Sequence, residues 1–188
     1  TVAFFVFGSA GWALLPLVAR RELGLGPAGY GVMLACIGLG AIAGAILLPR
    51  LRQRLNADRL MVAASLTFAI TMLALAFVRH FWLLNLFEFF TGFAWIAVLS
   101  TLNLGAQRSA ARWVKARALA VYLTVFFGSM TAGSAVWGQI ASQFGTPASL
   151  VVATLGMVLA SMTVFRWKLE KDPDLNLDLS GQPLDGVE

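Results

Sequence analysis

A single carboxylate, Glu88, lies inside the long apolar runs of this sequence, within residues 81–106. If that run is a helix, with about 100° between successive residues, then Asn85, Trp95 and Asn103 fall on the same face as Glu88. A carboxyl group placed in lipid can exchange a proton or bind a cationic group, and such residues usually face a bundle interior or a water-filled path. This face is therefore a candidate substrate or proton pathway.

A structural role for the same carboxylate remains open. Glu88 could pair with Arg79, with His80 or with a group on another helix, which would make it part of a buried ion pair rather than of a pathway. The residues alone do not decide between these two readings.

A second polar face is predicted on residues 118–140, where Thr131 and Gln139 lie on one side. Small residues accompany them, and another small pair occurs in residues 29–49. Small residues let neighbouring membrane helices approach closely, although glycine is also common in membrane helices in general. The glycines predicted to pack helices together are Gly40, Gly44, Gly128, Gly133 and Gly138.

The elements that must position these residues are predicted to be membrane-spanning helices. The chain has 188 residues, of which 59% are hydrophobic and 12% charged, far from the balance of a soluble domain. Six apolar runs are long enough for about 30 Å of hydrocarbon, which takes roughly 20 helical residues. They are residues 2–19, 29–49, 60–78, 81–106, 118–140 and 147–165. The third and sixth runs carry few polar side chains, so we expect them to face lipid or to support the others.

The basic residues predict the orientation of the chain. If the loops alternate between the two sides, eleven Lys and Arg lie on one side and three on the other. The positive-inside rule then places both chain ends in the cytoplasm. The candidate cytoplasmic loop residues are Arg50, Arg52, Arg54, Arg112, Lys115 and Arg117. We expect residues 1–167 to form the membrane domain and residues 168–188 a polar, acidic, disordered tail.

Several function classes find no support in the sequence. There is no phosphate-binding loop and no pair of metal ligands, so we expect no cofactor, no metal site and no enzymatic activity. The net charge of +5 comes from loop residues, which argues against nucleic acid as a partner. A membrane scaffold or assembly subunit remains an alternative to a transporter. An intramembrane serine protease is a remote one, because the single histidine, His80, lies in a loop.

A family resemblance rests on the central stretch. Its residues are Ser-Thr-Leu-Asn at 100–103, Gln107, Arg-Trp-Val-Lys-Ala-Arg-Ala-Leu-Ala-Val-Tyr at 112–122, and Gly-Ser-Ala-Val-Trp-Gly-Gln-Ile-Ala at 133–141. Together they resemble the second half of major facilitator superfamily transporters, in the branch that contains the bacterial enterobactin exporter and related drug or siderophore exporters. Leu48 stands where the superfamily's Gly-x-x-x-Asp-Arg signature has its aspartate.

The resemblance implies a fold, a partner and an activity. The fold is an all-α membrane protein whose six transmembrane helices form one half of a twelve-helix major facilitator fold. The partners are the bilayer, the missing N-terminal six-helix half, a small-molecule substrate and protons. The implied activity is secondary active transport, such as proton-coupled export of a siderophore or drug by alternating access in a bacterial inner membrane.

Overall fold

The computed structural model describes residues 2–108, 113 and 115–166, and this part of the chain is helical with no strand. The predicted tail at residues 168–188 and Arg112 lie outside the described residues. The helices, in chain order, are α1 (Val2–Leu17), its π-helical continuation η1 (Val18–Glu22), α2 (Pro27–Arg54), α3 (Ala57–Phe77), α4 (Phe81–Arg108), α5 (Lys115–Phe144) and α6 (Thr146–Arg166).

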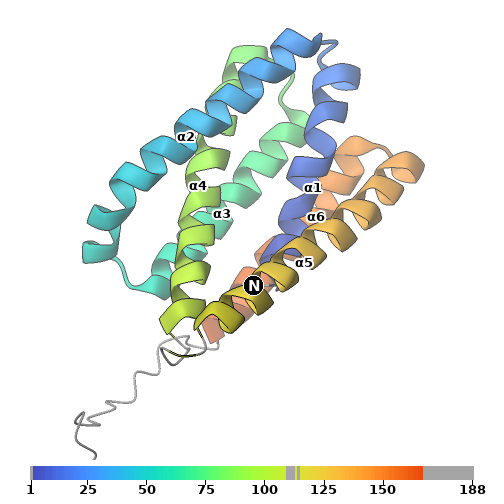
Figure 1. Ribbon diagram of the computed structural model, residues 1–188. Helices are drawn as coiled ribbons and strands as arrows, with labels where there is room; N and C mark the ends of the chain where they lie inside the picture. Colours follow the sequence, from blue (N-terminus) through green and yellow to red (C-terminus); the bar gives the residue numbers. More distant parts are fainter. Residues whose placement is uncertain (1, 109–112, 114, 167–188) are drawn as a thin grey trace, which may run out of the picture.

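Short connections make consecutive helices run up and down past each other (Figure 1). Between α5 and α6 a single residue, Gly145, reverses the chain with a φ of +88°, a conformation that side chains with a Cβ rarely adopt. Between α3 and α4 the turn is closed by Arg79, whose Nη2 donates to the carbonyl of Ala76 at 2.7 Å. These tight turns reverse the chain between consecutive helices.

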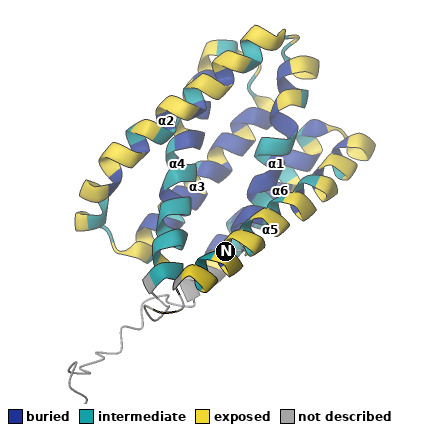
Figure 2. Ribbon diagram, viewed as in Figure 1, coloured by how far each residue is buried: buried dark blue, intermediate teal, exposed yellow. Residues whose placement is uncertain are grey.

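The helices form two rows. Figure 1 shows α2, α4, α1 and α5 toward the viewer and α3 and α6 behind them. Helix α2 packs mainly on α4, α1 packs on α5, and α3 joins α4 to α6. Burial differs between the helices: α1 and α3 are largely buried, whereas α2 and α5 expose most of their length (Figure 2). The third span, expected to be at the lipid boundary or in support, is thus an inner support of α4.

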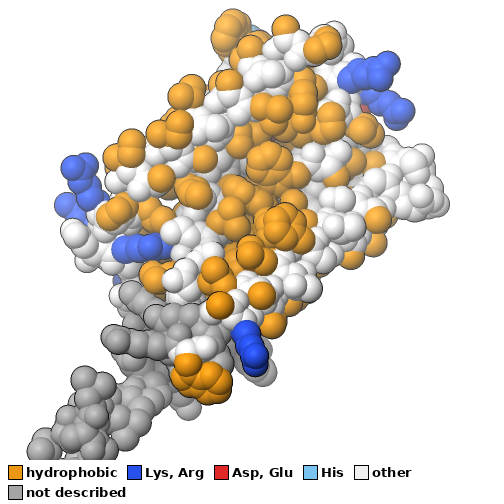
Figure 3. All heavy atoms as spheres, in the orientation of Figure 1, with side chains coloured by type: hydrophobic (Ala, Val, Ile, Leu, Met, Phe, Trp, Pro, Cys, Tyr) orange, Lys and Arg blue, Asp and Glu red, His pale blue; other side chains and the backbone are white. Residues whose placement is uncertain are grey.

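Among the described residues, five helices are long and apolar enough to cross a membrane, and they cover Val2–Glu22, Pro27–Arg54, Ala57–Phe77, Phe81–Gln107 and Ala116–Phe144. The sixth apolar segment, Thr146–Met162 of α6, is shorter, so a sixth span stays a prediction. In the space-filling view, hydrophobic side chains occupy the middle of the visible face, while Lys and Arg gather toward its ends (Figure 3). This distribution suits a protein whose middle lies in lipid.

The helix ends differ from the predicted spans. The second span was expected to stop at residue 49, but α2 continues through Pro49 to Arg54, and Leu55 N still donates to Leu51 O at 2.8 Å. A proline removes only one backbone donor, and the next residues can remain helical once they reach the polar membrane surface. As a consequence, α2 carries its arginines on a helix rather than in a loop.

Candidate functional site: a carboxyl buried between helices

The rotation of α4 is set by a backbone-to-backbone contact with α2. A Cβ built on Gly40 would lie 2.7 Å from the carbonyl carbon of Phe89, and a Cβ built on Gly92 would lie 2.7 Å from that of Ile37. Gly44 continues the contact, since its Cβ would lie 2.5 Å from Ile96 Cγ2. Only glycines permit this approach, which is the role small residues play in membrane helix packing.

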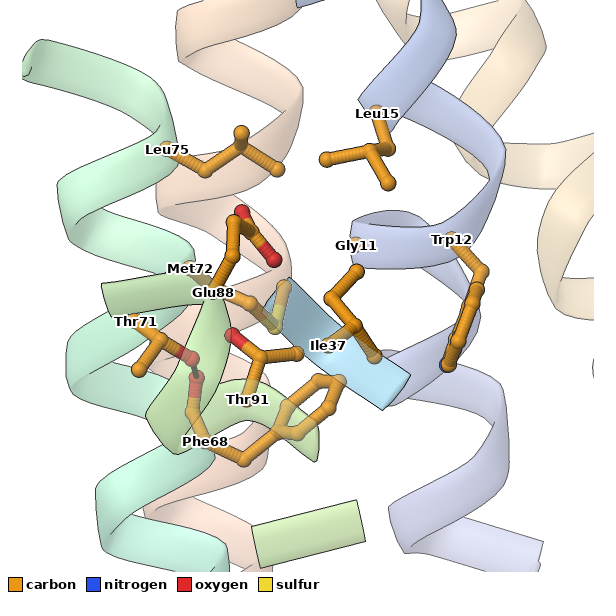
Figure 4. Close-up of a pocket in the computed structure, with 10 residues that line it drawn as sticks. All are labelled: Gly11, Trp12, Leu15, Ile37, Phe68, Thr71, Met72, Leu75, Glu88 and Thr91. Atoms are coloured by element: carbon orange, nitrogen blue, oxygen red, sulfur yellow. Dashed lines mark hydrogen bonds between the residues drawn. The ribbon is translucent and has the colours of Figure 1, made fainter. Parts of the chain in front are cut away.

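Because Phe89 and Gly92 face α2, the neighbouring Glu88 turns toward α1 and α3. Its side chain is 2% exposed, which places it among the most buried groups of the described chain. Figure 4 shows α1 and α3 flanking the carboxyl, with no basic side chain among the residues drawn. The lining residues are Gly11, Trp12 and Leu15 of α1, Ile37 of α2, Phe68, Thr71, Met72 and Leu75 of α3, and Thr91 of α4.

The cavity beside Glu88 is small and mostly apolar. Its volume is about 10 Å³, which is near the lower limit for holding one water molecule. Of the two hydroxyls in its wall, Thr71 donates to Phe68 O at 2.8 Å. Thr91 donates to Phe87 O at 3.2 Å and also lies within hydrogen-bonding reach of the Glu88 carboxyl. A carboxylate in such surroundings is costly to keep charged unless it is paired.

The basic partners considered for Glu88 are occupied elsewhere. Arg79 Nη2 lies 3.1 Å from Glu22 Oε2, at the end of the bundle where η1 meets the α3–α4 turn. His80 Nδ1 accepts from Leu83 N at 3.4 Å and caps the start of α4. Among residues 2–107 and 116–162 no Lys, Arg or His nitrogen approaches Glu88 to within 4 Å. The structural pairing with Arg79 or His80 is therefore not what the structure shows.

Trp95 does not line this cavity. It stands in an aromatic cluster, with ring centroids 5.3 Å from Trp12, 5.8 Å from Phe5 and Phe68, and 6.0 Å from Phe4. The cluster locks α4 to α1 and α3 next to Glu88. Trp12 Nε1 is buried and has no hydrogen-bond partner in the described structure. Its indole N–H was not singled out in the sequence, and a tryptophan on an apolar helix carries no signal that would have revealed it.

The remaining predicted pathway residues lie in three separate places. Asn85 is buried one turn before Glu88, where its Nδ2 donates to Phe81 O at 2.9 Å and its Oδ1 has no partner in the described structure. Asn103 lies about 22 Å beyond Glu88 along α4 at 1.5 Å per residue, where it accepts a hydrogen bond from Gln107. Thr131 and Gln139 are exposed on α5. The structure thus does not bring these residues together into one site within the chain.

The three glycines of α5 that were predicted to pack helices together have different surroundings. A Cβ built on Gly133 would lie 2.6 Å from the carbonyl oxygen of Val6, so this glycine packs against α1 as expected of a helix contact. Gly128 and Gly138 differ from that expectation, because a Cβ on either would meet nothing within 4 Å among the described residues. Their exposed positions show that α5 turns only one side of its small-residue face toward this chain.

Two contacts that sequence reasoning missed fasten α5 to its neighbours. Trp137 Nε1 donates to Val6 O at 2.7 Å, and Ser149 Oγ of α6 donates to Trp137 O at 3.0 Å. Ser9 of α1, in the sequence Gly-Ser-Ala-Gly at 8–11, donates its Oγ–H to Val6 O at 2.7 Å. The structure does not pair Ser9 with His80.

An antiparallel bundle of apolar, membrane-length helices with glycine-mediated packing is the architecture of a multi-pass membrane protein. The chain belongs to the family described as transmembrane secretion effector, which matches residues 1–184 and is of the major facilitator type. No curated protein and no solved structure shows a significant match to the chain.

Proposed function

We propose that this chain is the C-terminal half of a secondary active transporter that exports a small molecule, such as a siderophore or drug, by alternating access coupled to protons. Family membership supports the transporter class. In this proposal the protein lies in a bacterial inner membrane with both ends of the chain in the cytoplasm, and α6 is the sixth span. The cytoplasmic side is the one that carries Arg50, Arg52, Arg54 and Arg117.

The observation that carries the proposal is the unpaired carboxyl of Glu88. Ionisable side chains inside membrane helices are expensive and usually mark ion or proton paths. Glu88 is held between α1, α3 and α4 by the glycine contact with α2 on one side and the aromatic cluster on the other. In this environment the neutral and charged forms of the carboxyl differ strongly in solvation, so a movement of α1 against α4 that admits water would change which form is held. Such a group can couple proton uptake to a change of conformation.

The missing N-terminal half is the partner that the proposal requires. Of the most apolar 18 residues of α5, 17% are buried within the chain, compared with 61% for α3. Polar and small positions of α5, namely Thr131, Gln139, Gly128 and Gly138, are exposed. Polar groups facing hydrocarbon are unfavourable, so a second half packed on the front row of α2, α4, α1 and α5 would cover them.

The test compares two carboxyl-to-amide substitutions in the complete twelve-helix protein. Glu88→Gln removes the carboxyl inside the membrane, and Glu22→Gln removes one that pairs with Arg79 at the end of the bundle. Both proteins are reconstituted in liposomes with an imposed pH gradient and given the same panel of solutes. We expect Glu88→Gln to lose gradient-driven flux while Glu22→Gln keeps it.

Three outcomes would count against the proposal. If Glu88→Gln transports at the wild-type rate with the same dependence on pH, Glu88 is not the coupling residue. If the complete protein moves no solute from the panel but still accumulates in the membrane, the result favours a membrane scaffold over a transporter. Flux from residues 1–188 reconstituted without the other half would remove the need for the partner.

A further inference from the structure

A larger cavity lies at the opposite end of α4 from Glu88. It has a volume of about 420 Å³ and is bounded by the end of α2, the last turns of α4 and the first turns of α5. A second cavity of about 300 Å³ adjoins it toward the start of α3, and the two share Arg52 and Leu104 in their walls. Volumes of this size are typical of small-molecule sites.

Arg52 supplies a positive charge to both cavities. Its side chain is half-buried, and Nη2 donates to Ser100 Oγ of α4 at 2.9 Å, which draws the guanidinium across from α2. No aspartate or glutamate is among the described residues that line either cavity, and the ion pair between Arg79 and Glu22 lies at the other end of the bundle. A guanidinium has five N–H donors and recognises planar oxyanions with two of them at once. Within the described residues the Arg52 guanidinium makes its hydrogen bond to Ser100, which leaves most of its donors for a ligand.

A buried hydroxyl faces the same cavity. Tyr122 of α5 is 7% exposed, it lines the 420 Å³ cavity, and its OH has no hydrogen-bond partner in the described structure. Buried polar groups are nearly always hydrogen-bonded, so an orphan donor in a cavity wall points to a bound group. Nearby, Gln107 donates to Asn103, a bond that uses one of the four amide N–H donors of the pair.

The rest of the wall is apolar. Ile96 and Leu99 of α4 and Leu123 and Phe126 of α5 line it, and Phe126 continues into the aromatic cluster around Trp95. The cavity therefore combines one unneutralised cation, several neutral hydrogen-bond donors and an aromatic and aliphatic surface. This combination fits a molecule with an oxyanion at one end and a flat or aliphatic body.

We propose that the Arg52–Tyr122 cavity binds an organic anion, with its carboxylate or other oxyanion on the Arg52 guanidinium and its apolar body against Phe126. The assignment of organic anions as the transported substrates rests on the proposed function. The assignment of the cavity as an anion-binding site rests on the cavity alone. A lipid headgroup would present the same oxyanion at the membrane surface. We commit to the small-molecule substrate, because the donors lie between helices in a wall that continues inward to the aromatic cluster.

The probe is radiolabelled 2-naphthoate, and its uncharged counterpart is 2-naphthamide. The complete twelve-helix protein is placed in lipid nanodiscs of phosphatidylcholine, which has no net charge, and equilibrium binding is measured by scintillation proximity. Arg52→Gln removes the charge but keeps an amide donor for Ser100. The matched control is Arg54→Gln, an exposed arginine at the same end of α2 that lines neither cavity.

We expect Arg52→Gln to raise the Kd for naphthoate by roughly tenfold or more, the loss of a charge-assisted hydrogen bond. Tyr122→Phe should raise it by roughly fivefold, the loss of a neutral one. Arg54→Gln should bind as the wild type does, and naphthamide should bind every variant equally weakly. Arg52→Lys keeps the charge and should fall between Arg52→Gln and the wild type, which separates an anion site from a general disturbance of the fold.

Equal naphthoate affinity in Arg52→Gln and Arg54→Gln would refute the anion site, as would equal binding of naphthoate and naphthamide by the wild type. A third arm adds phosphatidylglycerol to the discs. If this lipid abolishes naphthoate binding to the wild type and to Arg54→Gln alike, while crosslinking of the lipid depends on Arg52, the site takes a headgroup and the substrate assignment is overturned. None of these arms uses a proton gradient, so their failure is distinguishable from a failure of the Glu88 experiment.

Discussion

Replacing Gly40 by alanine should destabilise the protein through a single added methyl group. The new Cβ would lie 2.7 Å from the carbonyl carbon and 3.1 Å from the Cα of Phe89, with the carbonyl oxygen nearer still. Ordinary van der Waals contact begins at 3.4 Å, and the atoms in the way are backbone, which cannot rotate aside. Helices α2 and α4 must therefore separate, and such overpacking typically costs about 1–3 kcal/mol.

The expected cost lies at the upper end of that range, because the separation also loosens the reciprocal contact of Gly92 with Ile37. Alanine recovers about 0.5–1 kcal/mol through its better helix propensity, so the net loss should be about 2 kcal/mol. The matched control is Gly38→Ala, two residues earlier in α2, where a Cβ would meet nothing within 4 Å. That variant should be neutral or slightly more stable than the wild type.

The measurement is thermal unfolding in detergent, followed with a thiol-reactive fluorogenic dye. Cys36 is the single cysteine of the chain and is half-buried in α2, so unfolding exposes one defined reporter in every variant. For a chain of this size about 1 kcal/mol corresponds to roughly 2–4 °C, which predicts a fall in Tm of roughly 4–8 °C for Gly40→Ala. If Gly40→Ala melts together with Gly38→Ala, the two helices can shift without loss and the argument that glycines set the rotation of α4 is wrong.

Two further predictions concern α5 and the orientation of the chain. Gly133→Ala should destabilise in the same assay by about 1–3 kcal/mol because Val6 and Ser9 of α1 occupy the space of its Cβ, whereas Gly138→Ala should not; equal melting temperatures would show that α1 can yield. In a Cys36→Ser background, a cysteine at the exposed Ala28 should react with an impermeant maleimide added to intact cells, and a cysteine at the exposed Asn56 only after permeabilisation. Labelling of the cysteine at residue 56 from outside would invert the proposed topology.

The helices and the glycine contact of α2 could be predicted from the sequence. Which of the other small residues would contact a neighbouring helix could not. Membrane-length apolar runs permit only helices, so the elements follow from composition alone. The sequence predicted helix packing at Gly40 and Gly44, and these glycines do contact α4. It predicted the same for Gly128 and Gly138, where a Cβ would meet nothing within 4 Å among the described residues. The difference is tertiary, because a glycine helps packing only on the side of the helix that a partner covers.

The polar face of α4 was predicted as one surface, and the structure divides it. Glu88 faces α1 and α3, Trp95 enters an aromatic cluster with residues of three other helices, and Asn103 bonds to Gln107 near the far end of α4. A helical wheel places residues around one axis, but it does not contain the neighbouring helices α1, α2, α3 and α5. The Arg52 cavity escaped prediction for the same reason, since its groups come from α2, α4 and α5 and their meeting depends on how those helices cross.

The two proposed sites share one rigid element. Glu88 and Ser100, the partner of Arg52, are twelve residues apart on α4, about 18 Å along an unbroken helix. Helix α2 is fastened to α4 by the glycine contact, so in the proposed transport cycle we expect the pair to move as a unit, with the α1 and α5 contacts as the ones that change. A motion that opens the apolar seal around Glu88 on the α1 side would at the same time change the distance between Arg52 on α2 and Tyr122 on α5. Proton and anion would then bias the same movement from opposite ends of one helix pair, and thermodynamic linkage requires each to alter the affinity for the other.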